Sequence, residues 1–253
     1  MVSPGAKTGD RTIFAAYEED LAYIHDVGFG DFARKSAPGL LAILRQRGIE
    51  NGRVIDLGCG SGIWARALVD AGYQVTGVDL SAAMIGIARK RVPEAEFQIE
   101  SFLSVSLPRC GCVTALGEVL NYLSDRKNNR AALRRLFRRV FTALRPDGLF
   151  ICDLAGQRRH RGSRQRFFDG DGWTTLIEFQ HDSQRNRLMR RIITFRKVGK
   201  SYRCREETHV LQLYPARDIA VMLRQAGFRV RIVRGYGDFP LFPDTAGFVA
   251  RKP

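Results

Sequence analysis

The stretch Val54-Ile55-Asp56-Leu57-Gly58-Cys59-Gly60-Ser61-Gly62 decides the fold of this chain. Its apolar, β-branched beginning predicts a strand that ends on an acidic residue, and its glycines at alternate positions predict a turn whose backbone a ligand can approach closely. Apolar residues at helical spacing follow from Ile63 to Ala71. We therefore expect the amides of Gly60 to Gly62 to open the first turn of a helix and to point at a bound ligand.

A second carboxylate, Asp79, follows at the end of another apolar stretch, Tyr73 to Val78. In doubly wound α/β folds, a carboxylate about 20 residues after the glycine turn accepts hydrogen bonds from the ribose hydroxyls of an adenosine ligand. The dinucleotide fingerprint also needs a glycine three residues after its second glycine, and Ile63 stands at that position here. The spacing therefore differs from that of a dinucleotide site.

The pattern Gly58-x-Gly60-x-Gly62, with Asp56 before it and Asp79 behind it, resembles the class I S-adenosylmethionine-dependent methyltransferases, whose ligand is adenosine-like but carries no phosphate. The resemblance runs from about residue 53 to residue 154 and more weakly to the C-terminus. It implies an enzyme that uses S-adenosyl-L-methionine and releases S-adenosyl-L-homocysteine. Another Rossmann-like enzyme, binding a nicotinamide or sugar nucleotide, is the alternative.

Strands and helices alternate after the glycine turn, which predicts an α/β fold with a parallel sheet and right-handed crossovers. The resemblance implies a doubly wound, seven-stranded, mostly parallel Rossmann-like sheet with an antiparallel edge. We expect N-terminal helices that form a lid (1–50), a cofactor-binding core (51–156 and 215–253) and a basic antiparallel β insertion of three strands that caps the substrate (157–214). The other core elements expected are Tyr73 to Asp79, Ala82 to Arg91, Ala95 to Ile99, Gly111 to Leu116, Asn129 to Leu144, Leu149 to Leu154, Ala216 to Ala226, Phe228 to Val233 and Ala246 to Arg251.

The segment Arg11 to Arg47 predicts the two lid helices, joined at Gly28-Phe29-Gly30. Phe14, Tyr17, Leu21 and Ile24 repeat at helical spacing in the first helix, and the second spans Phe32 to Leu44. A helix flanked by glycines is suited to moving over a bound substrate. Tyr17 is therefore a candidate for contact with the acceptor, although aromatic stripes more often belong to a plain core.

The resemblance also assigns the residues that hold the cofactor. Asp56, Gly58, Gly60 and Gly62 would hold its methionine half, because an ammonium group needs acceptors, and Asp79 would bind the ribose diol. Leu80 and Met84 would form an apolar wall for the adenine, although Met84 also fits the buried face of its own helix.

One position departs from the family pattern at the adenine. After the third strand the family has an acidic residue that accepts from the adenine amino group, and this chain has Ser101, between Glu100 and Phe102. Ser101 or Glu100 would take that role, or only backbone and Phe102 would contact the ring. Gly117 ends the fourth strand at the same edge of the sheet and completes the expected cofactor site.

The acceptor is expected beside the segment Leu116 to Tyr122, where this family builds the wall between cofactor and acceptor. Nucleobase methylases of the family carry a proline motif there, and this chain has none, which favours the small-molecule branch. Glu118, His25, His209 and Tyr17 are the candidate catalytic residues, since each could bind the acceptor or remove its proton. Further polar candidates are Asn121 and Tyr122, with Tyr236 and Asp238 as weaker ones.

The net charge of +15 is the unusual feature of the composition. From Gln157 to Arg205 there are 14 Lys or Arg against 4 Asp or Glu, so this segment carries +10. Such a segment could attract an anionic small molecule or RNA, or be a solvated ribbon. An RNA-directed methyltransferase or nucleic-acid-binding protein is therefore the alternative function, and an idle cofactor-binding module is a third.

Composition gives further expectations. No apolar stretch approaches the roughly 20 residues of a membrane span, and no secretory signal is seen, so we expect a cytoplasmic protein without membrane contact. The five cysteines are odd in number and suit reduced thiols. Cys110-x-Cys112 is half of a metal pattern without its second half, so no metal site is expected. The oligomeric state is open.

Overall fold

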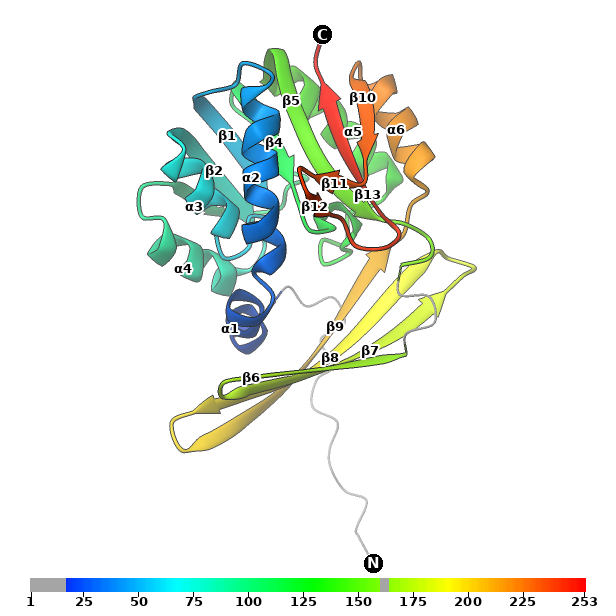
Figure 1. Ribbon diagram of the computed structural model, residues 1–253. Helices are drawn as coiled ribbons and strands as arrows, with labels where there is room; N and C mark the ends of the chain where they lie inside the picture. Colours follow the sequence, from blue (N-terminus) through cyan, green and yellow to red (C-terminus); the bar gives the residue numbers. More distant parts are fainter. Residues whose placement is uncertain (1–16, 160–163) are drawn as a thin grey trace, which may run out of the picture.

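The protein is described here by a computed structural model of residues 17–159 and 164–253 (Figure 1). Its centre is a seven-stranded sheet with the order β10-β13-β5-β4-β1-β2-β3. Five strands are parallel, and β13 pairs antiparallel with both β5 and β10. The strands are β1 (Gly52–Leu57), β2 (Tyr73–Asp79), β3 (Glu96–Ile99), β4 (Cys110–Ala115), β5 (Leu144–Ala155), β10 (Arg229–Val233) and β13 (Thr245–Arg251). The predicted doubly wound sheet is confirmed.

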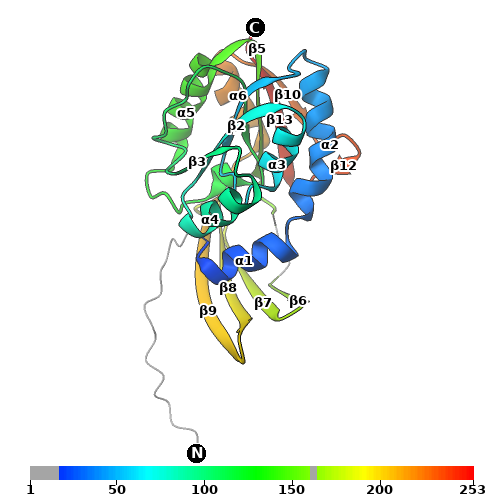
Figure 2. The same ribbon diagram turned by 90° about the vertical axis from the view of Figure 1, so that its left-hand side faces the viewer.

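Helices cover both faces of this sheet, and its central strands are accordingly rich in buried apolar residues (Figure 2). One face carries α5 (Arg130–Ala143) and α6 (Ala216–Gln225), which pack on Ile55, Val113 and Phe150. The other carries α2 (Asp31–Arg45), α3 (Ile63–Asp70) and α4 (Ala82–Arg91), which pack on Val54, Val75 and Ile151. Alternate residues of each strand therefore enter different cores, and the carboxyl ends of the parallel strands remain the open edge.

The insertion forms a separate antiparallel sheet of four strands, so the prediction of three strands was wrong. The strands are β6 (Gln165–Gly170), β7 (Trp173–Asp182), β8 (Arg187–Val198) and β9 (Ser201–Gln212). A turn at Asp171-Gly172, where Gly172 has a φ of +71°, splits the expected first strand into β6 and β7. Figure 1 shows this sheet below the carboxyl ends of the parallel strands.

The lid begins later than predicted. Helix α1 spans Glu19–Gly28, and Tyr17 precedes it with a φ of +25°, which is not helical. Phe14 lies outside the described residues. Helix α1 contacts both α4 of the core and β8 of the insertion, so it lies at the junction of the two sheets.

Two further differences concern irregular structure. Residues 145–148, which separate the predicted elements 129–144 and 149–154, lie within β5, where the pairing with β4 shifts register between Cys110 and Cys112. The hairpin of β11 (Gly235–Tyr236) and β12 (Phe239–Pro240) was not predicted.

Within the described ranges, no helix is both long and apolar enough for a membrane crossing. The same residues include no cluster of His, Cys, Asp and Glu suited to a metal ion.

Candidate active site

The glycine turn connects β1 to α3 at the open edge of the sheet. Gly58, Gly60 and Gly62 all have left-handed φ values, of +70°, +53° and +77°. A Cβ on Gly58 would lie 2.5 Å from the Val119 side chain, and one on Gly62 would lie 3.0 Å from Ala88 of α4. A Cβ on Gly60 would meet nothing within 4 Å. Gly60 is therefore the glycine whose backbone faces open space, as close approach of a ligand requires.

The amides of Gly58, Gly60 and Gly62 donate within the protein, so two of the three amides expected to point at a ligand, those of Gly60 and Gly62, already have partners. The amide of Gly60 donates to Asp79 Oδ2 at 2.9 Å, and that of Gly62 donates to the Cys59 carbonyl at 3.1 Å. The amide of Gly58 donates to the Val78 carbonyl at 2.6 Å. These bonds tie the turn to β2 and leave its shape, rather than its donors, as the feature open to a ligand.

Two carboxylates, the buried Asp56 and the half-buried Asp79, flank the open position at Gly60. Asp79 Oδ1 accepts from the Ser81 amide at 2.9 Å, and Asp56 Oδ1 accepts from the Thr114 hydroxyl at 2.7 Å. Burial raises the pKa of Asp56 to about 7 and raises the pKa of Asp79 as well. Neither carboxylate has an ion pair with a described residue. An ammonium group and a sugar diol would supply the cation and the donors that these carboxylates lack.

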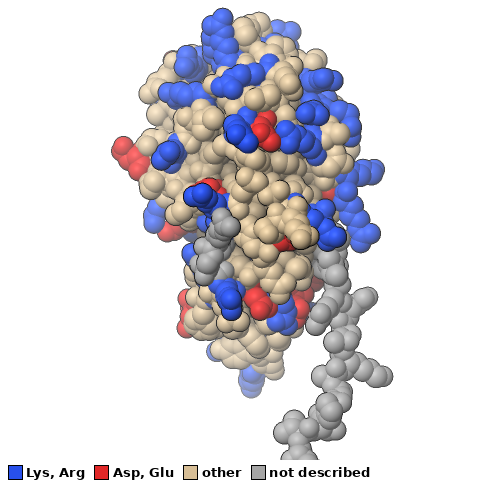
Figure 3. Space-filling view, turned by 90° about the vertical axis from the view of Figure 1, so that its right-hand side faces the viewer, with Lys and Arg blue, Asp and Glu red and all other residues tan. Residues whose placement is uncertain are grey.

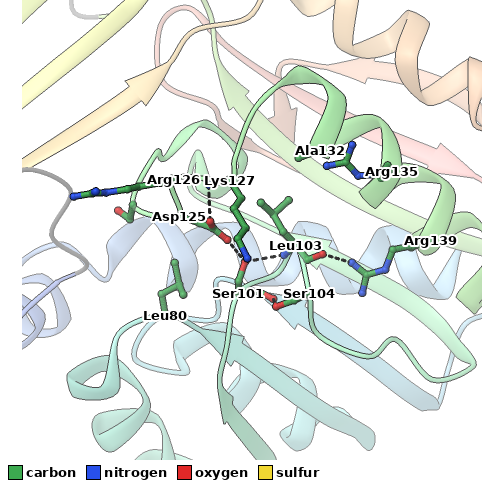
Figure 4. Close-up of a pocket in the computed structure, with 11 residues that line it drawn as sticks. Leu80, Ser101, Leu103, Ser104, Asp125, Arg126, Lys127, Ala132, Arg135 and Arg139 are labelled. Carbon is green, nitrogen blue, oxygen red and sulfur yellow. Dashed lines mark hydrogen bonds between the residues drawn. The ribbon is translucent and has the colours of Figure 1, made fainter.

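A cavity of about 540 Å³ opens beside the tips of β2 and β3 (Figure 4). Leu80 and Ser101 line it, as expected for the adenine end of the site. The Ser101 hydroxyl donates to Asp125 Oδ2 and accepts from the Leu103 amide at 3.0 Å. Asp125 thus brings a carboxylate to the place where the sequence offered only Ser101. The other residues lining the cavity are Leu103, Ser104, Ser124, Arg126, Lys127, Ala132, Arg135 and Arg139.

Met84 and Phe102, both expected at the adenine, are buried and are not among the residues that line this cavity. Met84 is only 2% exposed, and Phe102 packs into the core shared with α5. Glu100 joins the site through its backbone, since its amide donates to the Asp79 carbonyl at 3.0 Å. Leu80, Ser101 and Asp125 therefore line the cavity at the place where the sequence predicts the adenine.

A strained turn follows β4. Gly117 and Glu118 have consecutive left-handed φ values of +82° and +64°, which cost a residue with a Cβ about 1 kcal/mol or more. The Asp153 carboxylate holds this turn, accepting from the Gly117 amide at 3.0 Å and the Glu118 amide at 2.7 Å. The Tyr236 hydroxyl donates to its other oxygen at 3.3 Å. Burial raises the pKa of Asp153 to about 7, although these donors act in the opposite direction.

The Glu118 side chain lies between two buried arginines. Its oxygens accept from Arg159 Nε at 2.5 Å and from Arg190 Nη2 at 2.6 Å, and Thr245 Oγ1 adds a bond at 3.3 Å. Burial alone would raise the pKa of Glu118, but the two guanidiniums outweigh burial and lower it to about 2. A carboxylate with this pKa is a poor proton acceptor near neutral pH, so the geometry argues against a general-base role for Glu118, one of the candidate catalytic residues.

The other three candidate catalytic residues meet in one buried cluster beneath α1. The Tyr17 hydroxyl lies 3.1 Å from the Tyr122 hydroxyl, which also accepts from Arg190 Nη1 at 3.1 Å. The ring of Tyr17 lies 4.7 Å from the ring of His209 and 5.1 Å from that of His25, measured between centroids. The structure therefore brings together residues that the sequence placed on the lid, after the fourth strand and on the insertion.

Both histidines keep a ring nitrogen without a protein partner. His209 Nε2 lies 3.0 Å from Glu207 Oε2, whereas its Nδ1 and that of His25 are buried and make no hydrogen bond. Burial lowers the pKa of His25 to about 4, so this imidazole is neutral near pH 7. A neutral imidazole nitrogen is a proton acceptor, and buried polar atoms normally have partners.

Comparison with known proteins decides the family. A family model described as a methyltransferase domain matches residues 30–232, which is more than half of the chain. The chain belongs to this methyltransferase family. The predicted enzyme class is thereby confirmed.

The relatives of this methyltransferase differ in how much of the chain they match. The dTDP-3-amino-3,6-dideoxy-alpha-D-glucopyranose N,N-dimethyltransferase of Streptomyces fradiae is 26% identical over 87% of this chain and 88% of its own length. A protein of Geobacillus sp. (strain WCH70) is 36% identical, but over only 40% of this chain and 42% of its own length. The crystal structure of a S-adenosylmethionine-dependent methyltransferase from Clostridium acetobutylicum ATCC 824 has a TM-score of 0.79 at 18% identity, covering 91% of this chain and 97% of that one, and shows the same fold.

The other polar side chains predicted near the acceptor differ in their contacts and exposure. The Asn121 side-chain amide donates to the carbonyls of Ala155 and Gln212, at 3.1 and 2.6 Å, and so joins β5 to β9. Tyr236 is buried against Asp153, and Asp238 is exposed on the β11–β12 hairpin. Asp125, Asp153, Arg159 and Arg190 were missed, because each acts on a partner that is 24 or more residues away in the chain.

The positive charge of the insertion is partly neutralised within the protein. Arg196 and Arg203 pair with Asp20 of α1, and Arg159 and Arg190 pair with Glu118. Arg191 pairs with Glu178 and Glu206 on its own sheet. Figure 3 shows Lys and Arg gathered over the upper part of the molecule, with acidic and basic side chains mixed below. The insertion is therefore less basic on its surface than its composition indicates.

Proposed function

We propose that this chain transfers the methyl group of S-adenosyl-L-methionine to a small-molecule acceptor. The observation that carries the proposal is the open backbone at Gly60 between two carboxylates, the buried Asp56 and the half-buried Asp79. This site suits a ligand with an ammonium group and a ribose, and the third glycine of the dinucleotide fingerprint is absent, because Ile63 stands at its position.

Different residues of the cofactor site would bind different parts of the ligand. Asp56 would accept from the ammonium group and Asp79 from the ribose hydroxyls, while Leu80, Ser101 and Asp125 would bind the adenine. When bound, the cofactor supplies a methyl group on a positively charged sulfur. The protein's part is to hold an acceptor in line with that group, and alignment of this kind can contribute roughly 7–11 kcal/mol of the barrier.

The acceptor would bind in the cluster of Tyr17, Tyr122, His25 and His209. Two tyrosine hydroxyls and two unpartnered imidazole nitrogens could hold a nitrogen or oxygen nucleophile and accept its proton. A general base of this kind contributes about 10² to 10⁴ in rate. The name of the Streptomyces fradiae relative specifies methylation of an amino group on a nucleotide-linked sugar. That relative supports a small-molecule amine as the acceptor, and the partly neutralised insertion gives RNA no comparable support.

Calorimetry with S-adenosylhomocysteine tests the cofactor assignment. The parent should bind it, and Asp79→Ala should bind it at least tenfold more weakly, because a charge-assisted pair of hydrogen bonds is lost. Asp70→Ala, which removes a carboxylate 63% exposed at the end of α3, should bind like the parent. Since Asp79 also holds the glycine turn, circular dichroism must show that the variant is folded. No binding by the parent, binding of NAD instead, or equal affinity of Asp79→Ala would refute the proposal.

A further inference from the structure

The four-stranded sheet has two faces with different surroundings. Its inner face packs under α1, where Trp173 contacts Phe29 and where Arg196 and Arg203 reach Asp20. Because residues directly opposite each other on antiparallel strands share a face, the pairing Phe167–Leu176–Ile193 lies on the other, outer face. Thr174, Phe195 and Cys204 form the next row of that face, and Lys197 and Tyr202 the row after it.

The outer face exposes large apolar side chains. Phe167 and Tyr202 are each 63% exposed, Leu176 is 41% exposed, and Phe195 and Met189 are each 36% exposed. These five side chains come from all four strands of the sheet. Phe167, Leu176, Phe195 and Tyr202 lie in adjacent rows and form one surface, whereas the row of Glu178 and Arg191 separates Met189 from them. Contiguous apolar patches of this kind mark sites of association in soluble proteins.

The charge of the outer face indicates what kind of partner the face can bind. The register places three basic and four acidic side chains there: Arg187, Arg191 and Lys197 against Asp169, Glu178, Asp182 and Glu206. Arg191 lies 2.8 Å from Glu206 and 3.6 Å from Glu178, so part of this charge is already paired. Although the chain has a net charge of +15, the charges on this face nearly cancel. A copy of the same face would meet little repulsion, whereas a nucleic acid or an anionic membrane would find no basic surface.

We propose that two copies of this chain associate through the outer faces of their four-stranded sheets. A two-fold axis would place the same apolar rows of both copies against each other. Four strands about 4.8 Å apart and about 10 residues long present roughly 600 Å² of flat sheet. With its side chains this area approaches the roughly 800 Å² that each partner buries in a typical stable interface. The proposal does not depend on the reaction that the chain catalyses.

Sedimentation velocity and light scattering of the full chain test the proposal. The parent should be a dimer at about 100 µM, and the double variant Phe167→Glu/Phe195→Glu should be a monomer, with its affinity for itself reduced at least 100-fold. Val221→Glu, which places the same charge on a side chain 47% exposed on α6, should remain a dimer. Circular dichroism must show that both variants are folded. A monomeric parent, or a dimer that survives the double substitution, would overturn the proposal.

Cys204 provides a second readout that does not depend on shape. It is exposed and is paired directly with Phe195, whereas the other four cysteines are buried. Alkylation of its thiol should slow at least tenfold as the parent is concentrated from about 1 to 100 µM, and it should stay fast in the double variant. Alkylation rates that do not depend on concentration in the parent would contradict an interface at this face.

Discussion

The turn at Gly117 and Glu118 shows how single residues shape the acceptor side of the site. A left-handed Glu118 is unfavourable by itself, and it is held by the Asp153 carboxylate on one side and by two guanidiniums on the other. The Arg159 and Arg190 side chains are only 10% and 13% exposed, so their charges depend on Glu118. Glu118, predicted as a catalytic candidate, is therefore the counter-ion that allows Arg190 to reach Tyr122.

Glu118→Gln should mainly reduce stability. The change leaves two buried guanidiniums without their carboxylate, and we expect the free energy of unfolding in urea to fall by about 3–5 kcal/mol. Glu178→Gln makes the same change in a carboxylate that is 36% exposed, and should cost less than about 1 kcal/mol. If Glu118→Gln kept the parent's stability while losing methyl transfer, Glu118 would be a catalytic base and this interpretation would be wrong.

The buried imidazole of His25 should make stability depend on pH. Burial lowers its pKa from 6.5 to about 4 in the folded chain, so between these values the unfolded chain binds a proton that the folded chain does not. The free energy of unfolding should therefore fall as the pH drops from about 6.5 to 4, by up to about 3 kcal/mol.

Urea titrations of the parent and of His25→Phe across this pH range would isolate the contribution of His25. The substitution removes the titrating group, whereas the buried carboxylates of Asp56 and Asp153 titrate in both proteins and cancel in the difference. The parent should lose stability relative to His25→Phe only as the pH falls. A constant difference between the two proteins from pH 7 to 4 would show that His25 is not held neutral.

At the scale of elements, buried ion pairs that the sequence did not predict join α1 to the insertion. Asp20 is 2% exposed and accepts hydrogen bonds from both Arg196 of β8 and Arg203 of β9. Arg196 also stacks over the Tyr23 ring at 3.8 Å from its centroid. The core holds the other end of the helix through Arg91 and Asp26, at 2.8 Å. Opening the site to the acceptor would require some of these ion pairs to break.

Asp20→Asn should loosen this helix selectively. Losing the buried carboxylate should raise amide hydrogen exchange in residues 19–28 at least tenfold, while exchange in α5 stays unchanged. Glu19→Gln is the matched control, because its carboxylate reaches the same two arginines but is 73% exposed. Exchange in α1 that is equally fast in both variants, or unchanged in Asp20→Asn, would show that Asp20 does not fasten the lid.

The sequence predicted elements with strong local patterns and missed those that depend on distant contacts. The order of the core strands follows from apolar runs and glycine turns, which are local signals. Strand β6 was read as part of its neighbour because Phe167 continues the alternation across the turn at Gly172. Residues at the cofactor were expected from one contiguous motif, whereas the ion pairs of Glu118 join residues 41 and 72 positions away. No local pattern in the sequence predicts such ion pairs.

The whole molecule distributes its charge unevenly. The insertion carries +10 between Gln157 and Arg205, yet seven of the thirteen basic residues that the structure describes there form ion pairs, several of them with acidic residues of α1 and of the core. The charge therefore serves largely to join the insertion to the lid and to the strained turn. By contrast, Arg134, Arg135 and Arg138 of α5 are exposed on the core.

This distribution predicts weak binding of RNA. A protein that neutralises several phosphates loses about 10³ to 10⁵ in affinity between 50 and 200 mM salt, and tight binding at physiological salt requires many unpaired basic groups in one place. We expect fluorescence anisotropy with a single-stranded RNA to detect binding only at low salt, with a slope of about two charges or fewer. Substituting Ala for Arg134, Arg135 and Arg138 should remove this binding, whereas Arg164→Ala/Arg166→Ala in the insertion should not. Affinity that persists at about 150 mM salt and depends on the insertion would instead favour the RNA-directed function, because the insertion would then present a phosphate-binding surface despite its internal ion pairs.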